Sequence, residues 1–155
     1  MTDKNTVVVN NDIVESSYTT TNANLDQQTV YVDDYAKFIN NGTVGGINAT
    51  GVYLNNHSSF ENTASGIINN ASDYGVIAVN NSSAVNDGHI QNAGEVGMAG
   101  YSGSSIENAE NGIIENIVEN NIEEEVYRDD ELDKTTLYRL IPVDISDKES
   151  TLLEI

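Results

Sequence analysis

The fold of this chain is decided by three consecutive stretches that align with one another: FINNGTVGGINATGVYLNNHSSFEN (residues 38–62), TASGIINNASDYGVIAVNNSSAVN (63–86) and DGHIQNAGEVGMAGYSGSSIEN (87–108). In each stretch a glycine is followed nine residues later by a second glycine, and eleven residues after that by an asparagine. The first glycines recur at intervals of 24, 22 and 24 residues, and all length variation falls between the asparagine and the next glycine. Fixed spacings with insertions at one place indicate a structural repeat.

The aligned positions fall into three sets. The turn glycines are Gly42, Gly66, Gly88 and Gly112 at the first position and Gly51, Gly75 and Gly97 at the second. The asparagines are Asn40, Asn62, Asn86 and Asn108. The apolar columns are Val44, Ile68, Ile90 and Ile114; Val52, Val76 and Met98; and Phe60, Ala84 and Ile106. We expect the glycines to permit turns with positive φ and the apolar columns to form the core.

Each repeat contains three short β-prone segments separated by Gly, Asn, Ser and Asp. These segments are too short for helices and lack a period of 3.6 residues. The sequence therefore predicts an all-β fold, a short parallel β-solenoid with three faces and about 3.5 coils of 22–24 residues. Equivalent positions of successive coils would stack about 4.8 Å apart. The sequence alone does not fix the handedness.

The asparagine column is expected to form a structural ladder. An amide side chain has both donors and an acceptor, so each Asn can bond to the coil on either side and satisfy groups at the turn. A row of sugar- or ion-binding asparagines is the functional alternative. A second row, Ser58, Ser82 and Ser104 with the serine after each, is interpreted as turn chemistry.

The non-repetitive ends divide the chain into three parts: an N-terminal arm and cap (residues 1–37), the solenoid (38–122) and an acidic C-terminal cap or arm (123–155). Residues 29–32 could form part of a coil, and residues 6–9 could form an isolated strand or an arm. Residues 115–131 fit either a further coil or an acidic helix, and we favour a coil that gives way to a helical or irregular cap near Asn121. Residues 135–143 are a further strand candidate.

Charge excludes several function classes. The 155 residues include 25 acids and 6 bases, and the net charge of -19 divides into -4 for residues 1–41, -6 for 42–114 and -9 for 115–155. So few cations indicate that the chain does not bind nucleic acid, and an anionic membrane would repel it.

No apolar run is long enough to span a bilayer, and the N-terminus has no secretory signal pattern. With no Cys, thiolate sites are excluded.

Catalytic and metal-binding patterns are sparse. The two histidines, His57 and His89, fall at different offsets of the repeat, which favours surface turns over a catalytic pair. The acidic residues Asp129, Asp130 and Asp133 are candidate Ca²⁺ ligands, because clustered carboxylates suit that ion. The glycine of an EF-hand loop is missing there, so a solvated acidic run is the default. We expect no catalytic residues and no cofactor, with Ca²⁺ as the one candidate ion.

The repeat resembles those of bacterial autotransporter and haemagglutinin-like passenger domains. The pattern of an Asn, a Gly, an Ile and then Gly-Val is carried by Asn62, Gly66, Ile68, Gly75 and Val76, and the likeness extends over residues 38–122. The resemblance implies a right-handed parallel β-helix that is displayed on a surface and is often adhesive. Related solenoids build phage fibres and virion surface proteins.

We therefore expect a non-enzymatic structural subunit of an extracellular or virion assembly, such as a phage decoration, cement or fibre protein. Its partners would be other protein chains in a homo-oligomer or an assembly lattice, with no nucleic acid and no membrane insertion. A bacterial surface adhesin or interaction module, exported without a Sec signal, is the alternative. A β-helix enzyme acting on polysaccharides is a third possibility.

Overall fold

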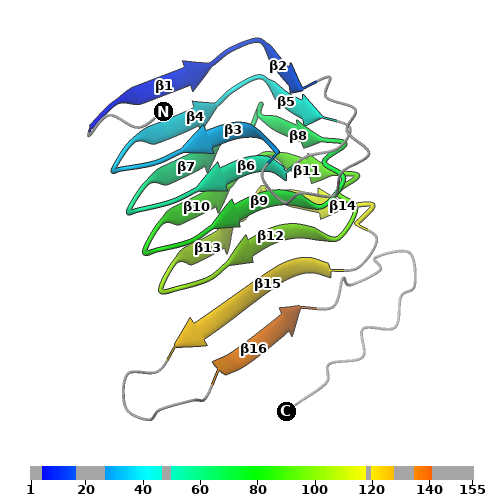
Figure 1. Ribbon diagram of the computed structural model, residues 1–155. Coiled ribbons are helices and arrows are strands. Elements are labelled where there is room, and N and C mark those ends of the chain that lie inside the picture. Colours follow the sequence, from blue (N-terminus) through cyan, green and yellow to red (C-terminus); the bar gives the residue numbers. More distant parts are fainter. Residues whose placement is uncertain (1–4, 17–26, 47–49, 118–119, 128–134, 141–155) are drawn as a thin grey trace.

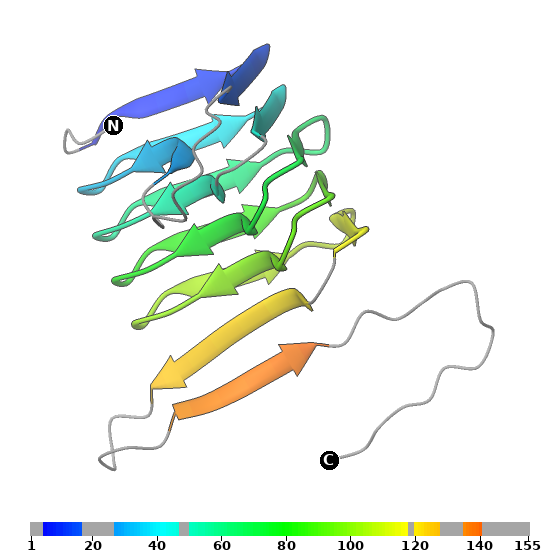
Figure 2. The same cartoon turned by 45° about the vertical axis from the view of Figure 1, so that its right-hand side comes forward.

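The computed structural model describes residues 5–16, 27–46, 50–117, 120–127 and 135–140. Every regular element in this part is a β-strand, and the strands wind into a parallel β-solenoid (Figure 1). The predicted fold class is therefore confirmed. Seen from the side, the coils stack as nearly level layers (Figure 2).

Three sheets form the faces of the solenoid. Sheet A contains, in spatial order, β1 (Val7–Asn10), β4 (Lys37–Asn40), β7 (Ser59–Asn62), β10 (Ser83–Asn86) and β13 (Ser105–Asn108). Sheet B contains β2 (Ile13–Ser16), β5 (Thr43–Gly46), β8 (Ile67–Asn69), β11 (His89–Gln91) and β14 (Ile113–Glu115). Sheet C contains β3 (Gln28–Val32), β6 (Thr50–Leu54), β9 (Tyr74–Ala78), β12 (Val96–Gly100), β15 (Asn120–Tyr127) and β16 (Thr135–Leu140). All neighbouring strands are parallel except β15 and β16.

The solenoid begins earlier than the glycine repeat indicates. β1, β2 and β3 pair with β4, β5 and β6, so the predicted boundary at residue 37 falls inside the stack, and residues 6–9 are not an isolated strand. The chain completes four turns between β1 and β13. Asp12 and Thr29 occupy the register positions at which later coils have glycine. Val7 pairs with Lys37, so the first coil spans 30 residues at this position instead of 22–24. The first coil therefore lacks both the glycines and the spacing that mark the others.

The C-terminal end continues as strands. Residues 120–127, where a helical or irregular cap was expected near Asn121, form β15, with Ile122 opposite Met98 of β12. The apolar spacing there also fits a helix, but pairing with β12 gives the backbone hydrogen bonds that a helix would otherwise supply. The strand expected within residues 135–143 is present as β16, which pairs antiparallel with β15. Residues 128–134 lie outside the described part.

The core consists of side chains that stack in register inside the coils. Phe38 and Phe60 are in register, with ring centroids 5.7 Å apart and planes inclined by 17°. The interior members of the predicted columns are at most 2% exposed: Val44, Ile68, Ile90, Val52, Val76, Met98, Phe60 and Ala84. Ile106 and Ile114, in the last coil, are partly buried and pack against this cluster. Each large buried side chain contributes about 1.5–3 kcal/mol through removal of apolar area from water.

The repeat glycines are needed for close backbone approach, and the expectation that they supply positive φ was wrong. Of the described glycines only Gly103 has a positive φ, at 76°. A Cβ at Gly75 would instead lie 2.5 Å from the Gly97 carbonyl oxygen and 2.7 Å from Cγ2 of Ile90. Positive φ falls on the corner residues, which include Asn56, Asn70, Asn80, Asn81, Asn92 and Asn116. Asparagine tolerates this conformation better than most residues, which explains its abundance at the corners.

Substituting Gly75 should therefore destabilise the solenoid more than substituting Gly45. Gly75→Ala forces a methyl group against backbone and a core isoleucine and should cost about 1–3 kcal/mol. A Cβ at Gly45 would lie 3.4 Å from its nearest neighbour, the Asn69 carbonyl oxygen, so Gly45→Ala should change stability by less than about 0.5 kcal/mol. Urea denaturation followed by circular dichroism measures both values. Equal losses would contradict the close-approach explanation.

Candidate functional site

The predicted asparagine ladder runs through the interior of the solenoid. Nδ2 of each Asn donates to Oδ1 of the equivalent Asn one coil further on. The three distances are 2.8 Å from Asn40 to Asn62, 2.7 Å from Asn62 to Asn86 and 2.7 Å from Asn86 to Asn108. Asn40, Asn62 and Asn86 are 0% exposed. Because ligands cannot reach these amides, the ladder is structural.

A fifth member, Asn10, extends the ladder into the first coil. Its Nδ2 donates to Oδ1 of Asn40 at 2.8 Å, and its own Oδ1 accepts from the Asp12 backbone N–H at 3.1 Å. Asn10 does not fit the glycine repeat, because Asp12 replaces the glycine that follows the other asparagines. The pair Asn10-Asn11, matching Asn40-Asn41, is the signal that could have found it.

The second amide hydrogen of each ladder residue secures the adjoining turn. Nδ2 of Asn40, Asn62, Asn86 and Asn108 donates to the carbonyl oxygen of the following Gly42, Gly66, Gly88 and Gly112, at distances of 2.8–3.2 Å. A Cβ on Gly66 would collide with Oδ1 of Asn62 and with the Asn40 carbonyl oxygen. The first glycine of the repeat is therefore needed by the ladder itself.

The serine row is also structural. Ser58, Ser82 and Ser104 are at most 6% exposed, and Oγ of Ser58 donates to the Val32 carbonyl oxygen at 3.1 Å. The Ser82 backbone N–H donates to Oγ of Ser104 at 3.0 Å. These hydroxyls satisfy backbone groups where the chain passes from sheet C to sheet A. Each buried side-chain polar atom of the described residues has a hydrogen-bond partner.

The two histidines lie in different parts of the solenoid. His57 lies in a corner and stacks on Tyr35, with ring centroids 4.9 Å apart. Nε2 of His89 lies 2.9 Å from Oε1 of Glu115 on the outer face of sheet B. Among the described residues no three His, Asp or Glu side chains gather as metal ligands. The Ca²⁺ candidates Asp129, Asp130 and Asp133 lie outside the described part.

Two surface features are candidates for function, and the first is the N-terminal end of the solenoid. Five of its apolar side chains are exposed: Val7 (57%), Val8 (37%), Val9 (47%), Ile13 (63%) and Val14 (37%). Val8 and Val14 are in register with the core residues Phe38 and Val44. The apolar columns of the core thus reach solvent at this end.

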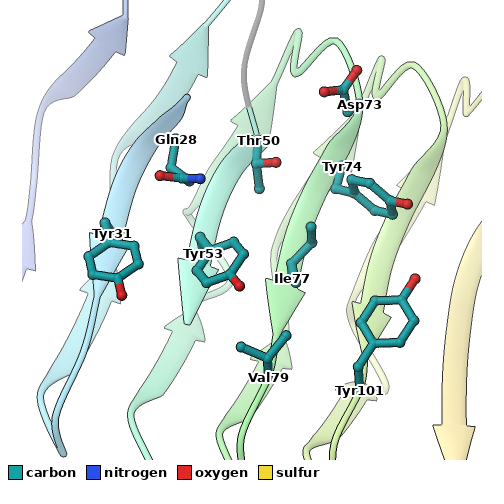
Figure 3. A pocket seen from close by; sticks show the side chains of 9 residues that line it. All are labelled: Gln28, Tyr31, Thr50, Tyr53, Asp73, Tyr74, Ile77, Val79 and Tyr101. Carbon is teal, nitrogen blue, oxygen red and sulfur yellow. The ribbon is translucent and has the colours of Figure 1, made fainter. Parts of the chain in front are cut away.

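The second feature is a groove of about 510 Å³ on the outer face of sheet C (Figure 3). Its lining comprises Gln28, Tyr31, Thr50, Tyr53, Asp73, Tyr74, Ile77, Val79 and Tyr101. Tyr31 and Tyr53 stack with ring centroids 5.6 Å apart and planes inclined by 20°. These tyrosines form no repeat pattern in the sequence, because only Tyr31 and Tyr53 share a register position.

No protein-family model, curated protein or solved structure matches the chain. The described residues include no helix of the length and apolarity needed to cross a membrane. The function must therefore be inferred from the two surface features themselves.

Breaking the ladder should cost more than removing an exposed asparagine. Asn86→Leu removes the acceptor of one Nδ2 hydrogen of the buried Asn62 and the donor to Oδ1 of Asn108, which should lower the free energy of unfolding by about 1–3 kcal/mol. Asn111→Leu removes one exposed bond to Asp87 and should cost about 0.5 kcal/mol. Urea midpoints of the two variants test this difference. A loss for Asn86→Leu no greater than that for Asn111→Leu would refute the structural importance of the ladder.

Proposed function

We propose that the chain is a non-enzymatic structural subunit of an extracellular or virion assembly, and that it joins other chains through the N-terminal end of its solenoid. The single observation that carries this proposal is the open apolar core at that end. The resemblance of the repeat to surface-displayed β-helices supports the location. A decoration, cement or fibre protein of a phage is the kind of subunit that the proposal describes.

The N-terminal end combines exposed apolar side chains with an edge strand, because β1 has a neighbour on only one side among the described strands. Thr6 and Asn10 use their carbonyl oxygens to accept from Lys37 and Asn41, so these groups of β1 face β4. Because backbone groups alternate along a parallel strand, the N–H and C=O groups of Val7 and Val9 point to the open edge. This edge strand, Val-Val-Val-Asn, contains no charge or proline of the kind that protects edges from pairing.

The opposite end disfavours stacking head to tail. If β1 of a second copy paired with β13, the β3 strand of that copy would need the place in sheet C that follows β15. β16 already occupies that place, running antiparallel to β15 (Figure 1). A second copy can instead bind head to head, with its β1 strand pairing antiparallel to β1 of the first copy. Such a contact is isologous and closes as a dimer rather than growing into a fibre.

A surface adhesin or interaction module is the second candidate function, and the groove on sheet C favours it. Tyrosine rings are common in binding surfaces because they offer rigid, amphipathic contact area at low entropic cost. An adhesive role and an assembly role use different parts of the molecule, so one chain can have both.

Association through β1 predicts that a charge on the edge strand abolishes the dimer. The purified chain should run as a dimer in size-exclusion chromatography with light scattering, and Val9→Lys should give a monomer. Salt should strengthen the wild-type association, because it screens repulsion between two chains of net charge -19.

Val85→Lys is the matched control, since Val9 and Val85 occupy the same register column of sheet A, with Ile39 and Glu61 between them. Both variants exchange Val for Lys, but β10 has a neighbour on each side. Val85→Lys should remain dimeric. A monomeric wild-type chain at all concentrations, or equal effects of the two variants, would overturn the proposed joint.

A further inference from the structure

We propose that the groove on sheet C binds an extended, arginine-containing peptide segment of a partner protein, with guanidinium groups lying against the tyrosine rings. This binding site is separate from the N-terminal joint and does not depend on it. The proposal rests on the shape of the groove, on its aromatic lining and on the carboxylates placed around it.

The groove lies over an outward column of sheet C in which the side chains become smaller. Its members Tyr31, Tyr53 and Ile77 follow one another in register. Tyr74 and Tyr101 lie beside Ile77 and Val79, on the side of the groove away from Tyr31 and Tyr53 (Figure 3). Four coils contribute to the lining, which gives the groove a length of about 14 Å at the usual strand spacing. A site of this length suits an extended segment better than a single small ion.

The tyrosine rings provide the first element of cation recognition. A guanidinium group within about 6 Å of an aromatic ring is attracted by the ring quadrupole, and arginine stacks on such faces more readily than lysine does. Tyr31, Tyr53, Tyr74 and Tyr101 present four rings along the groove (Figure 3). An extended peptide with arginines at alternate positions would place its guanidinium groups on one side, facing these rings.

Carboxylates provide the second element, and they lie near both ends of the sheet C strands. Asp73 lines the groove where β9 begins, and the exposed Glu95 is its register neighbour, with its backbone N–H donating to the Asp73 carbonyl oxygen at 2.7 Å. At the other end, the Tyr31 hydroxyl donates to Oδ2 of Asp33 at 3.2 Å. A cation in the groove would therefore have a carboxylate nearby both where the sheet C strands begin and where they end.

No cation competes for these carboxylates in the described part of the chain. None of the described lining residues is Lys, Arg or His. Lys37, the one Lys or Arg whose side chain the structure describes, lies in sheet A and bonds to Glu61 at 2.9 Å. The net charge of -19 adds a long-range attraction for basic ligands.

Other extended ligands fit less well. A β-strand cannot be added to this face, because backbone groups in the middle of sheet C are bonded to neighbouring strands. The tyrosine hydroxyls can donate to the carbonyl oxygens of a proline-rich peptide, but such a peptide offers no donor to the Asp73 carboxylate. A neutral oligosaccharide could donate hydroxyls to Asp73 but would gain nothing from the charge.

The test uses the full chain with tyrosine ring positions labelled for NMR. The probe is the capped peptide Gly-Arg-Gly-Arg-Gly, and the same peptide with citrulline in place of arginine is the uncharged, nearly isosteric control. We expect the arginine peptide to shift the ring signals of Tyr31, Tyr53, Tyr74 and Tyr101 but not those of Tyr35, which lies outside the groove. Affinity should be at least about five-fold higher than for the citrulline peptide, and 0.5 M salt should remove most of this difference.

Two charge variants separate the groove from general attraction to an acidic protein. Asp73→Asn should weaken binding of the arginine peptide by about three- to ten-fold. Glu107→Gln changes the net charge equally but lies on the exposed outer face of β13, so affinity should stay within about two-fold.

Three outcomes would overturn the proposal: equal binding of the arginine and citrulline peptides, equal effects of the two variants, or ring shifts produced instead by a neutral oligosaccharide such as cellotetraose. The third outcome would assign the groove to glycans. A failure of this kind leaves the N-terminal joint untouched, because salt should strengthen association there and weaken peptide binding here.

Discussion

Five asparagine amides, four of them buried and each bonded to the next, fix the relation between the coils of this solenoid. A buried amide loses its bonds to water, so every donor and acceptor must find a partner at hydrogen-bond distance. Only the in-register arrangement provides these partners, because a shift of one residue would turn each Asn to the outside and place a different residue inside. The ladder therefore sets the register of sheet A, and the chain connections carry it to sheets B and C.

Other sequence requirements follow from this register. The turn after each ladder residue must bring its backbone close to the coil before it, which explains Gly66 and Gly88. Insertions are tolerated between the Asn and this Gly because the amide still reaches the glycine carbonyl oxygen, across two residues in Asn86 and four in Asn62. The ladder and the close backbone approach restrict which residues can occupy the interior. They do not restrict the residues on the outer faces and at the two ends. Both candidate functional features lie there.

The repeat predicted the fold and most of the core, because stacked positions leave fixed spacings in the sequence. It did not reveal the first coil, in which Asp12 and Thr29 replace the glycines, although Asn10 keeps the ladder. It indicated a coil only as far as about Asn121 and not the rest of β15, whose apolar spacing also fits a helix until pairing with β12 is considered. The groove could not be predicted for a different reason. Its tyrosines occupy three register positions of sheet C, and their proximity depends on how neighbouring strands lie side by side rather than on any single column.

The ladder also has a direction. Every Nδ2 group donates towards the C-terminal end, so the amide dipoles are aligned along the axis, and each polarises the next. None of the three inner amides, Asn40, Asn62 and Asn86, can rotate without leaving two neighbours mismatched. The coils are thus coupled electrostatically as well as by their strands, and a solenoid of this size should unfold as one cooperative unit instead of fraying coil by coil from its open end.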